Sequence, residues 1–193
     1  MQNQLEKFKA ITIENFSNPA FEYHEWIVDY HLKIVEKIAI ELCDLYPDAD
    51  RESVETLVWF HDFGKPLDRK NEKAVTLVEG PKVMKECGFT DEFIAKTIEY
   101  WKMMEQKDTA DISTMPIEVQ IISTADGASH FTGVFHASYW SDGLSFPETQ
   151  AALRTKIKKD WERKITIPEA KKAFEPYYKR ALELVGEFPE KFI

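Results

Sequence analysis

The sequence is poor in several features, and each shortage excludes a class of protein. Only two cysteines occur among 193 residues, Cys43 and Cys87, each within an apolar helical pattern. This excludes a disulfide framework and indicates buried thiols in a reducing compartment. There are seven glycines, and no Asn-Gly or Asp-Gly turn lies between alternating apolar segments, so β-hairpins are not expected.

Long apolar runs and excess positive charge are also missing. No segment approaches the roughly 20 apolar residues of a membrane span, and the first ten residues mix acids and bases instead of forming an apolar signal core. We therefore expect a cytoplasmic protein with no membrane partner. The net charge of −9 argues against nucleic acid as a partner, because that binding needs concentrated Lys and Arg.

What the sequence does contain is ample material for one core. Hydrophobic residues make up 44% of the chain, with 13 Phe, 7 Tyr and 5 Trp. A chain of this length suits one domain better than two. We predict a single unit over residues 1–193.

Apolar residues recur at helical spacing almost throughout, which predicts an all-α fold. Capping residues and helix breakers divide this pattern. Asp50 and Thr90 suit N-caps, Gly88 suits a C-terminal stop, and Pro81 predicts a kink or a split. The predicted helices cover residues 3–16, 22–46, 51 to about 64, 70–87, 91–104, 117–131, 147–164 and 168–186.

Five polar side chains fall on helix faces that otherwise indicate a core. His31 and His61 each follow apolar residues at helical spacing, and Asp62 lies at the edge of the same face. Asp126 and His130 are four residues apart on a later helix. Because buried carboxylates need a cation, and because mixed imidazole and carboxylate ligands suit Mn, Fe, Co, Ni or Zn, these residues predict a bound divalent transition metal ion.

The order of these residues resembles the HD-domain superfamily of metal-dependent phosphohydrolases. His31 is followed by the pair His61 and Asp62 in "HDFGK", and then by Asp126 in "TADGASH". The resemblance covers a core of about residues 22–136 and leaves a C-terminal helical extension of about 147–193. It implies an HD-type helical bundle in which His31, His61, Asp62 and Asp126 bind the metal.

The resemblance also implies an activity. A bound divalent cation can polarise a phosphoryl oxygen and lower the pKa of a bound water. The expected reaction is hydrolysis of a small phosphate ester, possible substrates being phosphomonoesters and nucleotides. Besides Asp62, the expected catalytic residues are Lys65, which can bind a phosphate oxygen, and His130, which can bind phosphate or donate a proton to the leaving oxygen.

Two alternatives stay open. Family members with two metals carry further histidines, and the approximate alignment places Thr76 and Trp101 at those positions. One metal is therefore expected, although a di-iron HD-type oxygenase is an alternative. A second alternative is a non-catalytic module that retains the metal for ligand binding or sensing.

Other residues could extend the site or serve the fold. His24 lies seven residues before His31 and could replace it as a ligand. The basic stretch 154–164 could bind an anionic part of the substrate or form a solvated helix face. Seven aromatic residues could stack on a base, although an ordinary core is favoured: Tyr23, Trp26, Trp59, Tyr100, Trp101, Tyr139 and Trp140.

Overall fold

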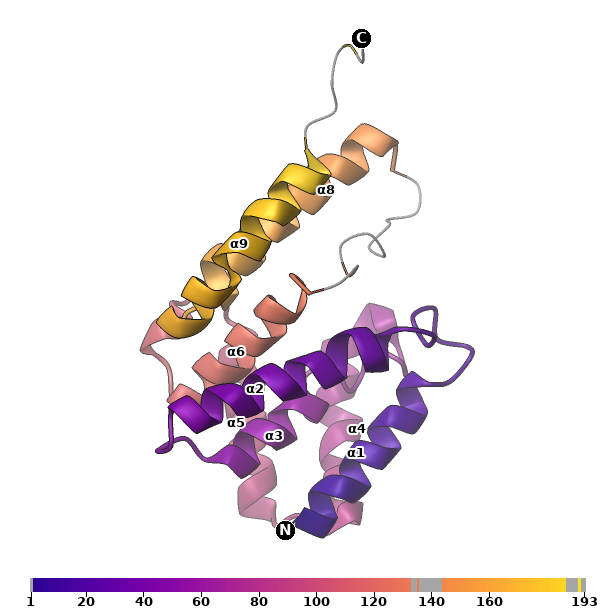
Figure 1. Ribbon diagram of the computed structural model, residues 1–193. Coiled ribbons are helices and arrows are strands. Elements are labelled where there is room, and N and C mark those ends of the chain that lie inside the picture. The colour runs from indigo at the N-terminus through magenta and orange to yellow at the C-terminus, as the bar shows by residue number, and fades with distance from the viewer. Residues whose placement is uncertain (1, 133–134, 136–143, 187–190, 192–193) are drawn as a thin grey trace.

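Helices make up the regular structure of the computed structural model, which describes residues 2–132, 135, 144–186 and 191 (Figure 1). No strand occurs in these ranges. The predicted all-α fold is therefore confirmed. No helix within them is both long and apolar enough to cross a bilayer. The α-helices are α1 (Gln2–Phe16), α2 (Lys33–Leu45), α3 (Arg51–Phe60), α4 (Glu72–Cys87), α5 (Asp91–Met104), α6 (Ile117–Ser129), α8 (Phe146–Lys159) and α9 (Pro168–Val185).

Short helical segments of other pitch connect these helices. Two are 3₁₀ turns, η2 (Arg69–Asn71) and η3 (Ile112–Thr114). The other two, η1 (Val28–Leu32) and η4 (Asp160–Lys164), are π-helical. Single π turns within longer helices are rare and are frequent at functional sites.

Local start and stop signals explain several helix ends. The carboxylate of Asp50 accepts a hydrogen bond from the amide of Ser53 at 3.3 Å, and the hydroxyl of Thr90 accepts one from the amide of Phe93 at 3.2 Å. Gly88 ends α4 with a φ of 96°, a conformation that glycine adopts without steric cost. These three predicted caps are confirmed.

Other predicted boundaries were wrong. Residues 22–26 form turns, so the second helix does not begin at Glu22, and the π turn η1 precedes α2. The third helix ends at Phe60 instead of near Gly64, because turn hydrogen bonds such as Lys65 N to Asp62 O replace helical ones. The fourth helix starts at Glu72 and continues unbroken through Pro81. The helix predicted over 147–164 changes to π pitch at Asp160.

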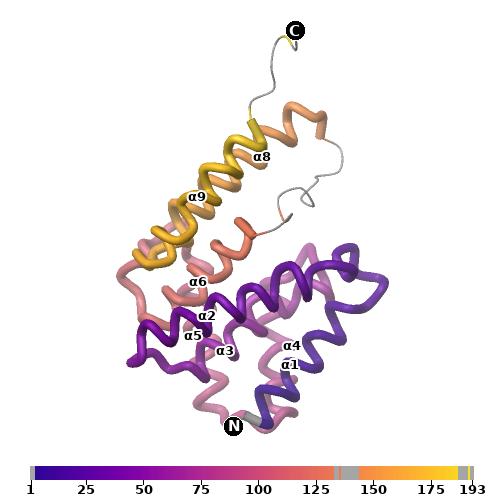
Figure 2. Tube along the Cα trace, in the orientation of Figure 1, coloured from indigo at the N-terminus to yellow at the C-terminus, as the bar shows by residue number. Residues whose placement is uncertain are grey.

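One buried core joins the helices. It includes Phe8 of α1, Phe60 of α3, Ile122 of α6 and Ile165 beyond η4. Helix α2 packs against α3 and α6, while α1 packs against α3 and α4. The antiparallel pair α8 and α9 lies alongside α6, on the side of the molecule away from α1 and α4 (Figures 1 and 2).

Candidate metal and phosphate site

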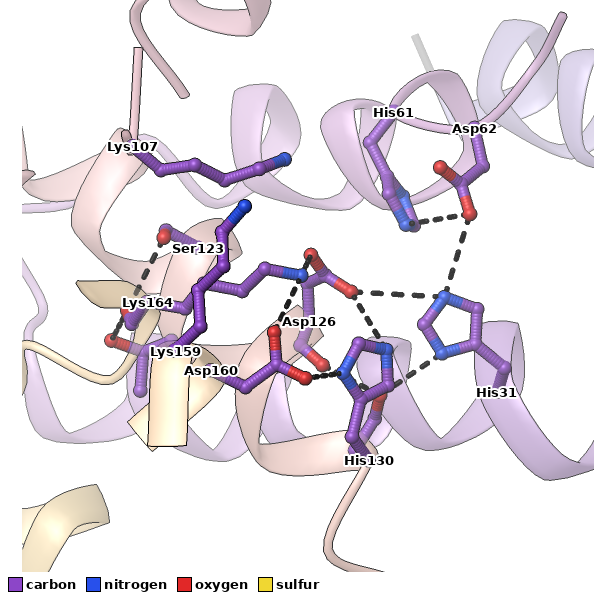
Figure 3. Close-up of polar contacts among 12 residues, drawn as sticks. His31, His61, Asp62, Lys107, Ser123, Asp126, His130, Lys159, Asp160 and Lys164 are labelled. Carbon is purple, nitrogen blue, oxygen red and sulfur yellow. Dashed lines mark hydrogen bonds and ion pairs between the residues drawn. The ribbon is translucent and has the colours of Figure 1, made fainter. Parts of the chain in front are cut away.

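The predicted site residues surround a cavity of about 1090 Å³. They come from distant parts of the chain and meet here because α2, α3 and α6 pack against one another. Segment η1, the turn after α3, and the end of α6 each contribute side chains to this space (Figure 3). The residues are His31, His61, Asp62, Lys65, Asp126 and His130.

His31 lies on the π turn η1 and is 2% exposed. Its Nδ1 is 3.0 Å from the hydroxyl oxygen of Ser129, and that hydroxyl donates its only hydrogen to the carbonyl of Asp126 at 2.7 Å. Nδ1 of His31 must therefore be the donor to Ser129. The lone pair of a neutral His31 is then on Nε2, which faces Asp62 and Asp126.

His61 is fixed by the backbone around it. Its Nδ1 donates to the carbonyl of Val58 at 2.7 Å, while its own carbonyl accepts the indole N–H of Trp101 at 2.8 Å. The following turn is held against α4, where Gly64 N donates to the hydroxyl of Thr76 at 2.9 Å. A Cβ at Gly64 would lie only 2.2 Å from a backbone oxygen of α4, so this close approach requires glycine.

His130 is held in the same manner, with a carboxylate in place of a carbonyl. Its Nδ1 lies 2.7 Å from Oδ2 of Asp160, and the ring of Phe135 stacks on it with centroids 4.1 Å apart. A carboxylate beside Nδ1 fixes which ring nitrogen carries the hydrogen. The neutral ring then carries its lone pair on Nε2, which faces Asp126.

The ligand atoms converge at spacings longer than hydrogen bonds. Nε2 of His31 lies 3.6 Å from Oδ2 of Asp62 and 3.8 Å from Oδ1 of Asp126. Nε2 of His61 is 3.5 Å from Asp62, and Nε2 of His130 is 3.4 Å from Asp126. Ligand atoms at about 2.1 Å from one ion lie roughly 3.0 to 3.4 Å apart in octahedral or tetrahedral geometry. The observed spacings are close to that range.

These atoms form two groups that share one member. His31, His61 and Asp62 form the first group and His31, Asp126 and His130 the second, with ligand atoms within 4.8 Å of one another in each. The four predicted ligands thus line one cavity, and His130 joins them as a further candidate. His130 was identified in the sequence by its position four residues after Asp126, but the role predicted for it there was catalytic.

The residues present fit a cation, and a buried atom without a partner carries that test. Nε2 of His61 is buried, and no hydrogen-bond partner for it is found among the described residues. A buried polar atom in that state is costly unless something else satisfies it. Since Nδ1 already donates to Val58, Nε2 offers the lone pair that a metal ligand needs.

Three further charged residues support the site from behind. The sequence marked Lys156 and Lys164 only as members of a basic stretch that could bind an anionic part of the substrate, and it did not mark Asp160. Lys164 of η4 places Nζ 2.8 Å from Oδ2 of Asp126, and Lys156 of α8 lies 2.7 Å from Asp160. Gly127 allows η4 to approach α6, because a Cβ there would lie 2.7 Å from Cβ of Lys164. Asp160 and Lys164 are buried and lie three and seven residues after buried Ile157. This helical spacing from a buried residue is the signal in the sequence that could have identified Asp160 and Lys164 as inward-facing.

Electrostatics keep the site carboxylates ionised. Burial alone would raise the pKa of Asp62, but the ammonium group of Lys65 at 2.5 Å holds it well below the usual range. Burial alone would also raise the pKa of Asp126, but nearby positive charge, chiefly that of Lys164, holds it well below the usual range. The carboxylates are therefore negatively charged at neutral pH.

The imidazoles respond in the opposite sense. Burial lowers the pKa of His31, against the influence of the nearby Asp62 and Asp126. Burial also lowers the pKa of His130 well below the usual value, and the charge of Lys156 adds to this effect. Neutral imidazoles at physiological pH are the form that binds a metal.

The remaining candidates divide between the cavity and other places. His24 hydrogen-bonds to the carbonyl of Phe21 and does not line the cavity. In the basic stretch, Lys156, Lys159 and Lys164 line the cavity, whereas Arg154 bonds to carbonyls near the end of α9.

The aromatic candidates divide in the same way. Tyr23, Trp26 and Trp101 line the cavity, and Trp59 is a core residue. Tyr100 packs partly buried against the core. Two of the seven aromatic candidates, as well as the end of the predicted 22–136 core, lie outside the described residues: Tyr139, Trp140 and His136.

Comparison with known proteins found no relative of this chain. No family model, curated protein or solved structure matches the chain.

Proposed function

We propose that this protein hydrolyses a small phosphate ester with one divalent transition metal ion bound by His31, His61, Asp62 and Asp126. The observation that carries the proposal is the common arrangement of three buried histidines. Each directs Nδ1 to an acceptor outside the site and Nε2 toward Asp62, Asp126 or, for His31, both. The resemblance of "HDFGK" and its spaced partners to HD-domain phosphohydrolases supports the same reaction.

A single ion suits this arrangement better than two. Both candidate ligand groups include His31, and its Nε2 is the atom that faces both carboxylates. One imidazole nitrogen binds one ion. Thr76 and Trp101 use their polar atoms to hold the backbone of the turn after α3, so neither replaces the extra histidines of two-metal sites.

The chain's own residues can account for proton movement. A divalent cation at this cluster would polarise the phosphoryl group and lower the pKa of a coordinated water. His130 can accept the proton of the attacking water at Nε2 and return it to the leaving oxygen. Asp160, bonded to Nδ1 at 2.7 Å, stabilises the imidazolium formed between these two steps.

Lys65 and Lys164 offer positive charge to phosphate oxygens. Each is bonded to a site carboxylate, at 2.5 Å for Lys65 with Asp62 and at 2.8 Å for Lys164 with Asp126. Both also line the cavity. The size of that cavity favours catalysis over a non-catalytic module, because a substrate can reach the histidines.

A substrate screen with matched histidine variants tests the proposal. Purified protein is assayed with p-nitrophenyl phosphate and nucleoside monophosphates, each with Mn, Fe, Co, Ni or Zn. We expect turnover that EDTA abolishes and one of these metals restores. His61→Ala should lose this turnover, whereas His24→Ala should retain it because His24 does not line the cavity. Absence of metal-dependent turnover across the screen, with metal bound, would contradict the proposal.

A further inference from the structure

The outer part of the cavity carries more positive charge than the acidic side chains paired with its lysines neutralise. Among the described residues, eight Lys or Arg and six Asp or Glu line the cavity, in a chain where 34 acids outnumber 25 bases. Local reversal of the overall charge indicates attraction of anions. Three of these lysines pair with carboxylates outside the histidine cluster and are called here the rim lysines: Lys73, Lys107 and Lys159.

Two of the rim lysines share one carboxylate. Nζ of Lys73 lies 2.6 Å from Glu105, and Nζ of Lys107 lies 2.8 Å from the same side chain. Two cations on one carboxylate leave one positive charge in excess. Lys107 is the less exposed of the two, with 18% of its side chain accessible against 63% for Lys73, so its charge is less screened by solvent.

The third rim lysine has the same surplus. Lys159 of α8 binds Asp108 at 2.8 Å, and Arg163 binds the same carboxylate at 3.1 Å. Asp108 directly follows Lys107 in the chain, so the two groups of ion pairs that each carry a surplus positive charge are adjacent. Figure 3 shows Lys107 and Lys159 extending from different segments toward the space in front of the histidine cluster.

The cavity is larger than a single phosphate requires. Its volume of about 1090 Å³ is slightly above the roughly 300 to 1,000 Å³ found for pockets that hold drug-sized ligands. Positive charge therefore occurs at two places in one space: at the histidine cluster, through Lys65 and Lys164, and at the rim. A substrate with one anionic group would use only the first.

We infer that the substrate carries at least two anionic groups: the phosphate to be hydrolysed, bound at the histidine cluster, and a second phosphate or a carboxylate bound by the rim lysines. This inference rests on the proposed function for the identity of the first group. Charge-assisted hydrogen bonds from lysines give the second group its affinity. Binding of the second group should weaken as ionic strength rises, because the rim lysines are partly exposed.

Non-hydrolysable phosphonates separate the two anion sites. Titration calorimetry of the Mn-loaded protein compares propylphosphonate, which has one anionic group, with propane-1,3-diyl bisphosphonate and 3-phosphonopropionate, which have a second phosphonate or a carboxylate. Of the two ligands with a second anionic group, we expect the tighter one to bind about tenfold more tightly than propylphosphonate. Which one is better identifies the second group as phosphate-like or carboxylate-like.

Charge-removing variants assign that preference to the rim. Lys107→Gln with Lys159→Gln should reduce the tenfold preference to less than about threefold while leaving propylphosphonate binding unchanged. The matched control is Lys158→Gln with Lys179→Gln, two exposed lysines that do not line the cavity. A preference that is absent in the wild type, or that persists in the rim variant, would overturn the inference.

These binding results are independent of turnover. Rim-dependent preference without hydrolysis of any ester would reject the proposed function and retain the second anion site. Hydrolysis of p-nitrophenyl phosphate without any preference among the phosphonates would retain the proposed function and reject the second anion site. Circular dichroism of the rim variant establishes that it folds.

Discussion

Lys164 and Asp126 form a buried ion pair of 2.8 Å, although 38 residues separate them in the chain. The lysine comes from the π turn η4 and the aspartate from α6. Their contact joins the C-terminal helices to the histidine cluster. The pair leaves Oδ1 of Asp126 facing His31 and His130, while Oδ2 is occupied by the ammonium group.

Replacement of Lys164 by Met tests what this ion pair contributes to stability. The variant leaves a buried carboxylate without its cation, which should lower the free energy of unfolding by about 3 to 5 kcal/mol in EDTA. Added Mn should recover part of the loss, because a divalent cation can neutralise the same carboxylate. Urea unfolding measures both effects. Lys158→Met is the exposed control, and a loss in Lys164→Met as small as in that control would contradict the expected role.

Metal content tests the ligand assignment directly. Elemental analysis after gentle purification should find about one metal ion per wild-type chain, and none in His61→Ala or Asp62→Ala, because each variant removes a proposed ligand. His24→Ala should bind metal like the wild type. Full metal retention in both site variants would count against the assignment.

Ligand-linked stability gives an independent measure of the same binding. A ligand that binds only the folded state at 100 times its dissociation constant adds about 2.7 kcal/mol to the free energy of unfolding. Thermal unfolding with and without Mn should therefore show stabilisation in the wild type and in His24→Ala, but not in Asp126→Asn. Equal stabilisation of all three proteins would exclude Asp126 as a ligand.

The hydrogen bond between Asp160 and His130 should matter for turnover more than for substrate binding. Asp160→Asn removes the charge that stabilises the imidazolium, so kcat should fall by about 10² to 10⁴ while KM changes little. His130→Gln should cost a similar factor. The double variant should be no slower than the slower single variant, because the two residues act as a unit. Steady-state kinetics with p-nitrophenyl phosphate measures this.

Asp108→Asn provides the matched control for that experiment. Asp108 pairs with Lys159 and Arg163 instead of a histidine, so its loss should leave kcat unchanged for a substrate with one phosphate. Additive effects of Asp160→Asn and His130→Gln would mean that Asp160 acts on something other than His130.

The N-cap of α3 should make stability depend on pH in the acid range. Burial alone would raise the pKa of Asp50, but hydrogen bonds from Lys96 and Ser53 more than offset this and lower it. A lowered folded-state pKa stabilises the fold at pH above the usual aspartate value of about 3.9. That contribution is lost as the pH falls through the folded-state pKa.

Asp50→Ala should therefore cost about 1 kcal/mol at pH 7 and progressively less in acid. Urea unfolding of both proteins, from pH 7 down to the lowest pH at which the wild type stays folded, measures the difference. Glu52→Ala, in the first turn of the same helix but without the cap hydrogen bond, is the control. A difference between wild type and Asp50→Ala that is constant across this range would contradict the argument.

Local signals made much of the fold predictable. Asp50, Thr90 and Gly88 mark helix ends through short-range backbone chemistry, and that chemistry is the same in the sequence and in the folded chain. The change of pitch at η1 and η4 depends instead on tertiary packing. Pitch of this kind has no short sequence signature, so the continuous helices predicted over 22–46 and 147–164 were wrong in those places.

The candidate site was predictable only in part for the same reason. His31, His61 and Asp126 stand out because a polar side chain interrupts an apolar face. Asp160 and Lys164 lie in a stretch rich in charge, where a buried pair resembles a solvated surface. Their position became clear only when η4 was seen to pack against α6.

The two π turns also limit how the chain can vary in length. A π turn is in effect an α-helix with one additional residue, and each residue of an α-helix rotates the chain by about 100°. Deleting a single residue from η1 would restore α pitch and change the rotation between His31 and the residues that precede the segment. The same deletion in η4 would turn either Asp160 or Lys164 out of its pairing. We therefore expect insertions and deletions to be tolerated less well in these two five-residue segments than in loops.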